Sequence, residues 1–261
     1  MTTTTAPPGE TPRTGPGPRA LDRTAFASVL RWVTFASSWV WLGFVLFAVG
    51  ITRSNDATVG VTESVVGSLS ITPRQFLFAY GIVVVAGWCV PHVASGRTRR
   101  SLVTASAAAV GVAAIGYGAL LTAAFWVERP VYEANGWPLT LRTGHVFASG
   151  EQVGLVLAES VLIALALGFA GLAVGAGYRR FGGSRGTLAL LFTATPMLAA
   201  TAALELRASS ALGEALGVTG LSAPATLVVI AVLAAISLGT AYRLVRGAPA
   251  APLLALGGDQ P

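Results

Sequence analysis

Few side chains in this sequence could perform catalysis or bind a metal, and their spacing keeps them apart. The chain contains two histidines, His92 and His145, and a single cysteine, Cys89. Neither histidine has a cysteine or a carboxylate at metal-ligand spacing, and one cysteine cannot form an intrachain disulfide or a CxxC site. Ser149 stands among small residues but lacks the GxSxG elbow of serine hydrolases. The sequence therefore predicts no catalytic centre, no metal site and no bound cofactor.

The basic residues are all arginine, seventeen in number, and the chain has no lysine. A Walker A loop needs a lysine that reaches the terminal phosphates of ATP, and Schiff-base enzymes need a lysine amine. We therefore expect that the chain is not an enzyme and does not hydrolyse ATP by itself.

Glu159 is the one ionisable residue that lies well inside a long apolar run. A carboxylate at this depth in a membrane is costly and usually faces a cavity or a polar partner. In one interpretation Glu159 therefore lines the path of a transported substrate. In the other, the side chain extends toward the outer interface or hydrogen-bonds a neighbour such as Ser160, and its role is structural.

The elements that would position these residues are membrane-spanning helices. The chain is 54% hydrophobic and 11% charged, with a mean hydropathy of +0.70, whereas soluble domains carry about a quarter charged residues. Six apolar runs approach the roughly 20 helical residues that cross a bilayer. The runs are Trp32–Ile51, Phe76–Val90, Leu102–Val127, Val153–Tyr178, Thr187–Leu204 and Leu221–Tyr242. Because they are continuous rather than alternating, we expect an all-α polytopic membrane protein with six transmembrane helices, not a barrel.

The arginines are unevenly distributed between alternate loops. Twelve lie in the N-terminal tail, the second and fourth loops and the C-terminus, and five lie in the first, third and fifth loops. Cytoplasmic loops carry an excess of arginine and lysine, so both termini are predicted to be cytoplasmic. The net charge of +6 is then explained by topology and anionic lipid head groups, and we expect no nucleic-acid partner.

The chain divides into a bundle and two tails. Residues 1–24 are rich in threonine, proline and glycine without apolar periodicity, which predicts a disordered cytoplasmic tail and no signal peptide. Residues 25–246 form the six-helix domain, and residues 247–261 form a short cytoplasmic tail. Within the fourth run, Gly171 and Gly175 stand four residues apart, a spacing that favours close packing inside the bundle or, as a second interpretation, at a subunit interface.

The loop after the second run combines a glycine, helix-capping hydroxyls and a high positive charge. Gly96 can end one helix in a left-handed conformation, and Thr98 or Ser101 can cap the next helix. Three arginines belong to the same short loop: Arg97, Arg99 and Arg100. They serve either as a positive-inside anchor or as a docking site for acidic protein or lipid phosphate.

The order of four short motifs along the chain is informative. An amphipathic segment, Leu21–Arg31, leads into the first run, and the GxTRR-like turn Gly96–Arg100 follows the second. Tyr178–Gly183 forms a tyrosine-arginine and glycine turn after the fourth run, and the pair Gly136-Trp137 lies in the third outer loop. Together with the six spans, these motifs resemble the ABC-2 type permeases, the membrane subunits of bacterial ABC exporters, over most of residues 21–246.

The resemblance implies a permease that moves a hydrophobic or amphipathic substrate out of the cell across a bacterial plasma membrane. Its partners would be separate ABC ATP-binding subunits, a second permease copy in a homodimer or heterodimer, and membrane lipids. The loop that couples the permease to the ATPase in this family would consist of Gly96, Arg97, Thr98, Arg99 and Arg100. The segment Leu204–Gly220 would correspond to a partly re-entrant outer hairpin.

Two other classes of function stay open. A non-transport membrane scaffold or regulatory anchor would also need six spans. A secondary transporter is a third interpretation, but few intramembrane charges and no clear inverted repeat argue against ion coupling. An ATP-binding cassette gene beside this one would favour the permease.

Overall fold

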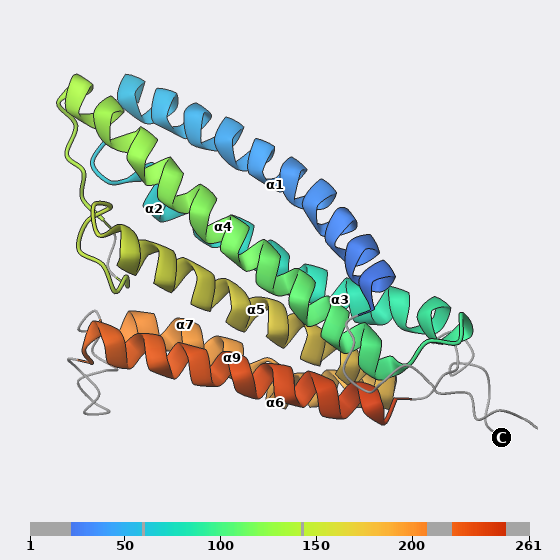
Figure 1. Cartoon of the computed structure of the whole chain (residues 1–261). Coiled ribbons are helices and arrows are strands. Elements are labelled where there is room, and N and C mark those ends of the chain that lie inside the picture. The colour runs from blue at the N-terminus through green and yellow to red at the C-terminus, as the bar shows by residue number, and fades with distance from the viewer. Residues whose placement is uncertain (1–21, 59–60, 142–143, 208–220, 249–261) are drawn as a thin grey trace, which may run out of the picture.

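The computed structural model describes residues 22–58, 61–141, 144–207 and 221–248. Within these ranges the chain forms helices and no strand, and six stretches are long and apolar enough to cross a membrane (Figure 1). The helices are α1 (Arg23–Thr58), α2 (Val65–Leu69), α3 (Ile71–Ala94), α4 (Arg99–Asn135), α5 (Val153–Phe181), α6 (Gly183–Thr193), α7 (Thr195–Arg207) and α9 (Ala223–Arg246). Each predicted run overlaps one of the six stretches, so the prediction of an all-helical, multi-pass architecture is confirmed.

Three predicted segments lie wholly or mostly outside the described residues. They are the N-terminal tail up to residue 21, the C-terminal tail from residue 249 and the greater part of the re-entrant hairpin, residues 208–220.

Several helices extend beyond the apolar runs. α1 begins at Arg23, so Arg23 and Thr24, predicted to end the disordered tail, are helical instead. From Arg23 on, the amphipathic segment before the first run is continuous with the spanning helix. α4 was predicted to end at Val127 but continues to Asn135, with Pro130 inside it. α3 begins at Ile71 rather than Phe76. The end turns of a spanning helix can be polar because they lie at head-group depth, and hydropathy alone therefore underestimates helix length.

The fifth span is interrupted, although its sequence predicts one continuous run. α6 ends at Thr193 and α7 begins at Thr195, with Ala194 between them. Pro196 has no backbone N–H and cannot continue the hydrogen-bond ladder of α6, so the helix breaks just before it. α7 then packs on α9, and both helices contact α5.

α5 is the central helix and contacts α3, α4, α6, α7 and α9. Its glycines allow α3 to approach at backbone distance. A Cβ atom at Gly171 would overlap the carbonyl oxygen of Phe78, and one at Gly175 would lie 2.7 Å from that of Ile82. On α3, a Cβ at Gly81 would lie 2.5 Å from the carbonyl oxygen of Gly168. The prediction that Gly171 and Gly175 serve packing within the bundle is therefore confirmed.

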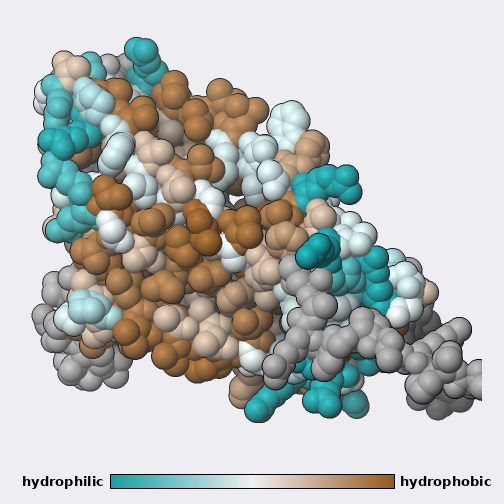
Figure 2. Space-filling model, viewed as in Figure 1, coloured by the Kyte–Doolittle hydropathy of each residue, from teal (hydrophilic) through white to brown (hydrophobic). Residues whose placement is uncertain are grey.

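On the face drawn in Figure 2, apolar side chains form a belt between two more polar ends of the bundle. Large side chains on the belt are exposed on α1 and α6, among them Phe35, Trp39, Phe47, Leu191 and Phe192. We call the end that carries the α3–α4 turn and the C-terminus of α9 the arginine end. The opposite end, with residues 136–141 and 144–152, is called the loop end (Figure 1).

Candidate functional site

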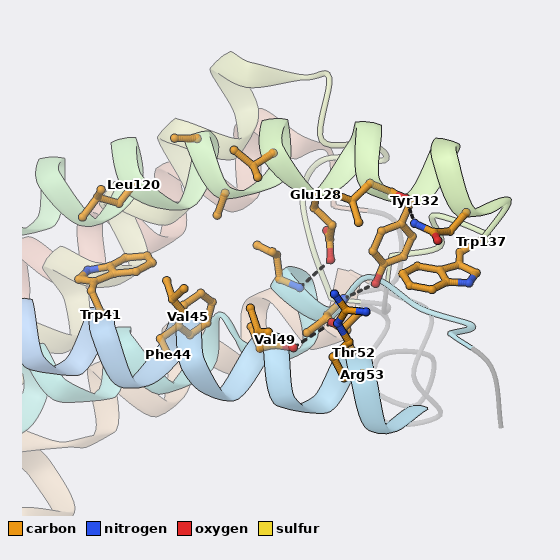
Figure 3. A pocket seen from close by; sticks show the side chains of 18 residues that line it. Trp41, Phe44, Val45, Val49, Thr52, Arg53, Leu120, Glu128, Tyr132 and Trp137 are labelled. Carbon is orange, nitrogen blue, oxygen red and sulfur yellow. Dashed lines mark hydrogen bonds between the residues drawn. The ribbon is translucent and has the colours of Figure 1, made fainter. Parts of the chain in front are cut away.

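A groove of about 580 Å³ lies between α1 and α4 (Figure 3). Its walls are mainly apolar side chains, including Trp41, Phe44 and Val49 of α1 and Leu120, Ala124 and Val127 of α4. Val65 and Val66 of α2 line it as well. We call this space the α1–α4 groove.

The buried carboxylate of Glu128 ties α2 to α4 at the loop end of the groove. The side chain is 8% exposed. One carboxylate oxygen accepts a hydrogen bond from the Ser64 hydroxyl at 2.6 Å, and the other accepts from the Val66 N–H at 2.9 Å. Buried carboxylates require such donors, and both oxygens of Glu128 are supplied from within the chain. The carboxylate is therefore committed to the fold and not to a ligand.

Tyr132, one helical turn after Glu128, makes a second polar connection. Its hydroxyl donates to the carbonyl oxygen of Glu63 at 2.9 Å and accepts from the Val65 N–H at 3.1 Å. Gly136 ends α4 with φ at +66°, a conformation that favours glycine. The next residue, Trp137, packs its ring edge-on against Tyr132 at a centroid distance of 5.5 Å. The Gly136-Trp137 motif therefore places an aromatic side chain at the polar end of the α1–α4 groove.

A second cavity, of about 330 Å³, continues along α1 toward the arginine end. Trp41 and Leu120 line both cavities and stand between them. The Trp41 ring lies 5.9 Å from the Tyr117 ring, measured between centroids. Beside these cavities α1 therefore contacts the bundle through a few large side chains, whereas Ala25, Val29 and Val33 near its start are buried in the core.

Glu159 lines neither of these two cavities. It is 3% exposed, and its oxygens contact His145 Nδ1 at 2.7 Å and the Val146 N–H at 2.6 Å. The His145 ring also stacks on Phe147. These contacts hold the loop before α5 against the start of that helix, and they favour the structural interpretation of Glu159 over a substrate path. The predicted neighbour, Ser160, is not the residue that satisfies the carboxylate.

The two histidines lie at opposite ends of the bundle, as predicted. His145 is at the loop end, while His92 Nε2 at the arginine end lies 2.9 Å from the Ser101 hydroxyl. The described residues contain no group of three or more histidine, cysteine, aspartate or glutamate side chains that could hold a metal ion. The pairing of His145 with Glu159 was not predicted from the sequence. The two residues are separated by a loop and the first turns of α5, and no local pattern indicates that they meet.

The predicted coupling loop forms a tight turn at the arginine end. Gly96 adopts φ of +77°, and the Thr98 hydroxyl caps α4 by accepting from the Ser101 N–H at 3.1 Å, both as expected. Only residues 95–98 separate α3 from α4. Arg97 is held by Asp22, with 3.4 Å between Nε and a carboxylate oxygen. The turn is thus fixed to the start of α1.

The same turn faces the C-terminus of α9 across a hollow of about 490 Å³. Four arginines line this space, which we call the arginine hollow: Arg97, Arg99, Arg100 and Arg246. Arg99 donates to the Arg246 carbonyl oxygen at 3.5 Å, so the two elements also touch directly. Arg246 was not predicted to lie beside this loop, because nothing in the local sequence pattern indicates that α9 ends next to the α3–α4 turn.

Comparison with known proteins gives no family. The chain matches no protein-family profile, no curated protein and no solved structure.

Proposed function

We propose that the chain is the transmembrane permease subunit of an ATP-driven ABC exporter. It moves a hydrophobic or amphipathic compound out of the cell across a bacterial plasma membrane, and a separate subunit hydrolyses ATP. Both termini and the arginine end lie in the cytoplasm, as the arginine distribution indicates. The permease acts with a second copy, and closure of the ATP-binding subunits rocks the two bundles against each other.

The arginine hollow is the observation that carries this proposal. It gathers Arg97, Arg99 and Arg100 from one turn and Arg246 from another helix around a single concave space. The guanidinium group binds carboxylates through two parallel hydrogen bonds, which makes such a cluster suited to an acidic protein surface. A positive-inside anchor would need charge but no common geometry. Because the turn is fixed to α1 through Asp22, force applied there would reach the first span.

The test uses a triple variant in which Arg97, Arg99 and Arg100 are replaced by lysine. Lysine keeps the charge and the membrane orientation but cannot form the bidentate contacts. The wild-type chain, purified from its native membranes, is expected to carry an ATP-binding cassette subunit, and the variant is expected to lose most of it. Arg185→Lys is the matched control, since Arg185 is exposed outside the arginine hollow.

Two results would contradict the proposal. If no ATP-binding subunit accompanies the wild-type chain, the scaffold or anchor function is favoured. If the triple variant retains the subunit and its ATP hydrolysis as fully as wild type, the arginine hollow is an anchor and not a docking surface.

A further inference from the structure

We propose that the α1–α4 groove binds one acyl chain of an anionic phospholipid and that Arg53 contacts the phosphate of its head group. This site would lie in the leaflet on the side of the loop end. The inference does not depend on the proposed function.

The groove opens sideways into the apolar belt. Its floor is formed by buried side chains such as Phe44, which is 6% exposed, and Tyr132, which is 2% exposed. Its rim is formed by apolar side chains that are half or more exposed, among them Val49 at 55% and Val127 at 67%. A molecule that fills the groove therefore enters from the bilayer. Apolar walls at this depth select a hydrocarbon chain.

The length of the groove fits one leaflet. Its lining on α1 runs from Trp41 to Arg53, which is about 18 Å at a rise of ~1.5 Å per residue. Half of the ~30 Å hydrocarbon core is about 15 Å. An acyl chain that lies along α1 would thus reach Trp41 with its methyl end when its head group is level with Arg53.

The polar end of the groove presents one charged donor. The carboxylate of Glu128 is satisfied by Ser64 and Val66. Arg53 is exposed and lines the groove, and no carboxylate among the side chains that the structure describes forms an ion pair with it. Arg129, at the same end of the bundle, is by contrast paired with Glu133 at 2.7 Å. The positive charge of Arg53 at this end of the groove favours an anionic lipid.

Trp137 and Tyr132 strengthen the assignment of this end to head-group depth. Both line the groove beside Arg53 (Figure 3), and amphipathic rings concentrate at the membrane interface. The guanidinium of Arg53 can bind two oxygens of one phosphate group. Apolar walls, a leaflet-long channel and a cation among interfacial aromatics together specify a phospholipid with a negative charge.

The experiment counts lipids bound to the full-length chain. Delipidated protein in mild detergent is titrated with phosphatidylglycerol and with phosphatidylcholine of the same acyl chains, and bound lipids are resolved by native mass spectrometry. We expect one phosphatidylglycerol to bind more tightly than phosphatidylcholine. Arg53→Gln should weaken phosphatidylglycerol about fivefold, the effect of one basic side chain at the surface, and should remove the preference.

A second variant tests the channel itself. Ala48 lines the groove from α1, and Ala48→Trp should displace the tightly bound lipid whatever its head group. Ile115→Trp is the control, because Ile115 is 60% exposed on α4 and lies outside both cavities. If Ala48→Trp does not elute as wild type in size-exclusion chromatography, Arg53→Gln decides the matter alone.

Three outcomes would overturn the proposal. The first is equal affinity for the two lipids in wild type, and the second is unchanged phosphatidylglycerol binding in folded Ala48→Trp or in Arg53→Gln. The third is thermal stabilisation by glycerol phosphate as large as that by phosphatidylglycerol, which would show that Arg53 binds a phosphate and the groove binds no chain.

Discussion

α5 and α1 are both long apolar helices, yet they meet the rest of the bundle in opposite ways. In the most apolar stretch of α5, 50% of the residues are buried, whereas in the corresponding stretch of α1 only 6% are buried. α5 faces α3 through Gly171 and Gly175 at backbone contact. α1 faces α4 through large side chains such as Trp41 and Phe44, with two cavities between them.

The difference shows how side-chain size decides what an interhelical space can do. Lipid is as apolar as the helix surface, so helices associate in a membrane mainly through close packing, and small residues provide it. The α3–α5 contact is therefore a fixed part of the fold. Where bulky side chains hold two helices apart, the remaining space can be filled by a ligand or by lipid, as we propose for the α1–α4 groove.

The largest expected effect comes from adding volume to the α3–α5 contact. Gly171→Ala would place a methyl group on the carbonyl oxygen of Phe78, so the two backbones would have to separate. We expect a loss of stability at the upper end of the about 1–3 kcal/mol typical of overpacking. Thermal unfolding in detergent micelles measures it. A variant as stable as wild type would show that α3 and α5 do not meet at backbone distance beside Gly171.

A smaller loss is expected at the N-terminal end of α5. Glu159→Gln leaves one acceptor oxygen for two donors, His145 and the Val146 N–H, and an unsatisfied buried donor should cost about 1–2 kcal/mol. Hydrogen exchange should also increase in residues 144–152. Glu151→Gln is the control, because this exposed carboxylate pairs only with Arg129 among the described residues. Unchanged stability together with altered export would instead support the substrate-path interpretation.

The smallest effect is expected in α1. A Cβ atom at Gly43 or Gly50 would have no atom within 4 Å, in contrast to Gly171. Gly43→Ala and Gly50→Ala should therefore leave thermal stability unchanged or raise it by up to about 1 kcal/mol, through the higher helix propensity of alanine. Marked destabilisation by either change would indicate that α1 is packed as closely as α5.

The spans and their packing glycines could be predicted from the sequence because both depend on local patterns. Apolar runs report burial in lipid directly, and Gly171 and Gly175 lie one turn apart on one helix face. The break before Pro196 was missed, since hydropathy does not register a lost backbone donor. The end of α4 was also misplaced, because Glu128 looks like a loop residue until its partners are known.

The candidate site was only partly predictable, for a different reason. The turn at Gly96 and its cap at Thr98 follow from local chemistry, and the structure reproduces both. The arginine hollow, the pairing of Glu159 with His145 and the α1–α4 groove all join residues from different helices. Such contacts depend on which helices are neighbours, and a single sequence does not contain that information in any local pattern.

The proposed docking of an ATP-binding subunit requires the arginine end to face the cytoplasm, and cysteine accessibility tests this directly. Single cysteines are placed at Asn135, at the loop end, and at Ser184, in the first turn of α6, in a Cys89→Ala background. An impermeant maleimide should label Asn135→Cys in intact cells, and should label Ser184→Cys only after the membrane is permeabilised. The reverse pattern would place the arginine hollow outside the cell, and the chain could not then be the permease we propose.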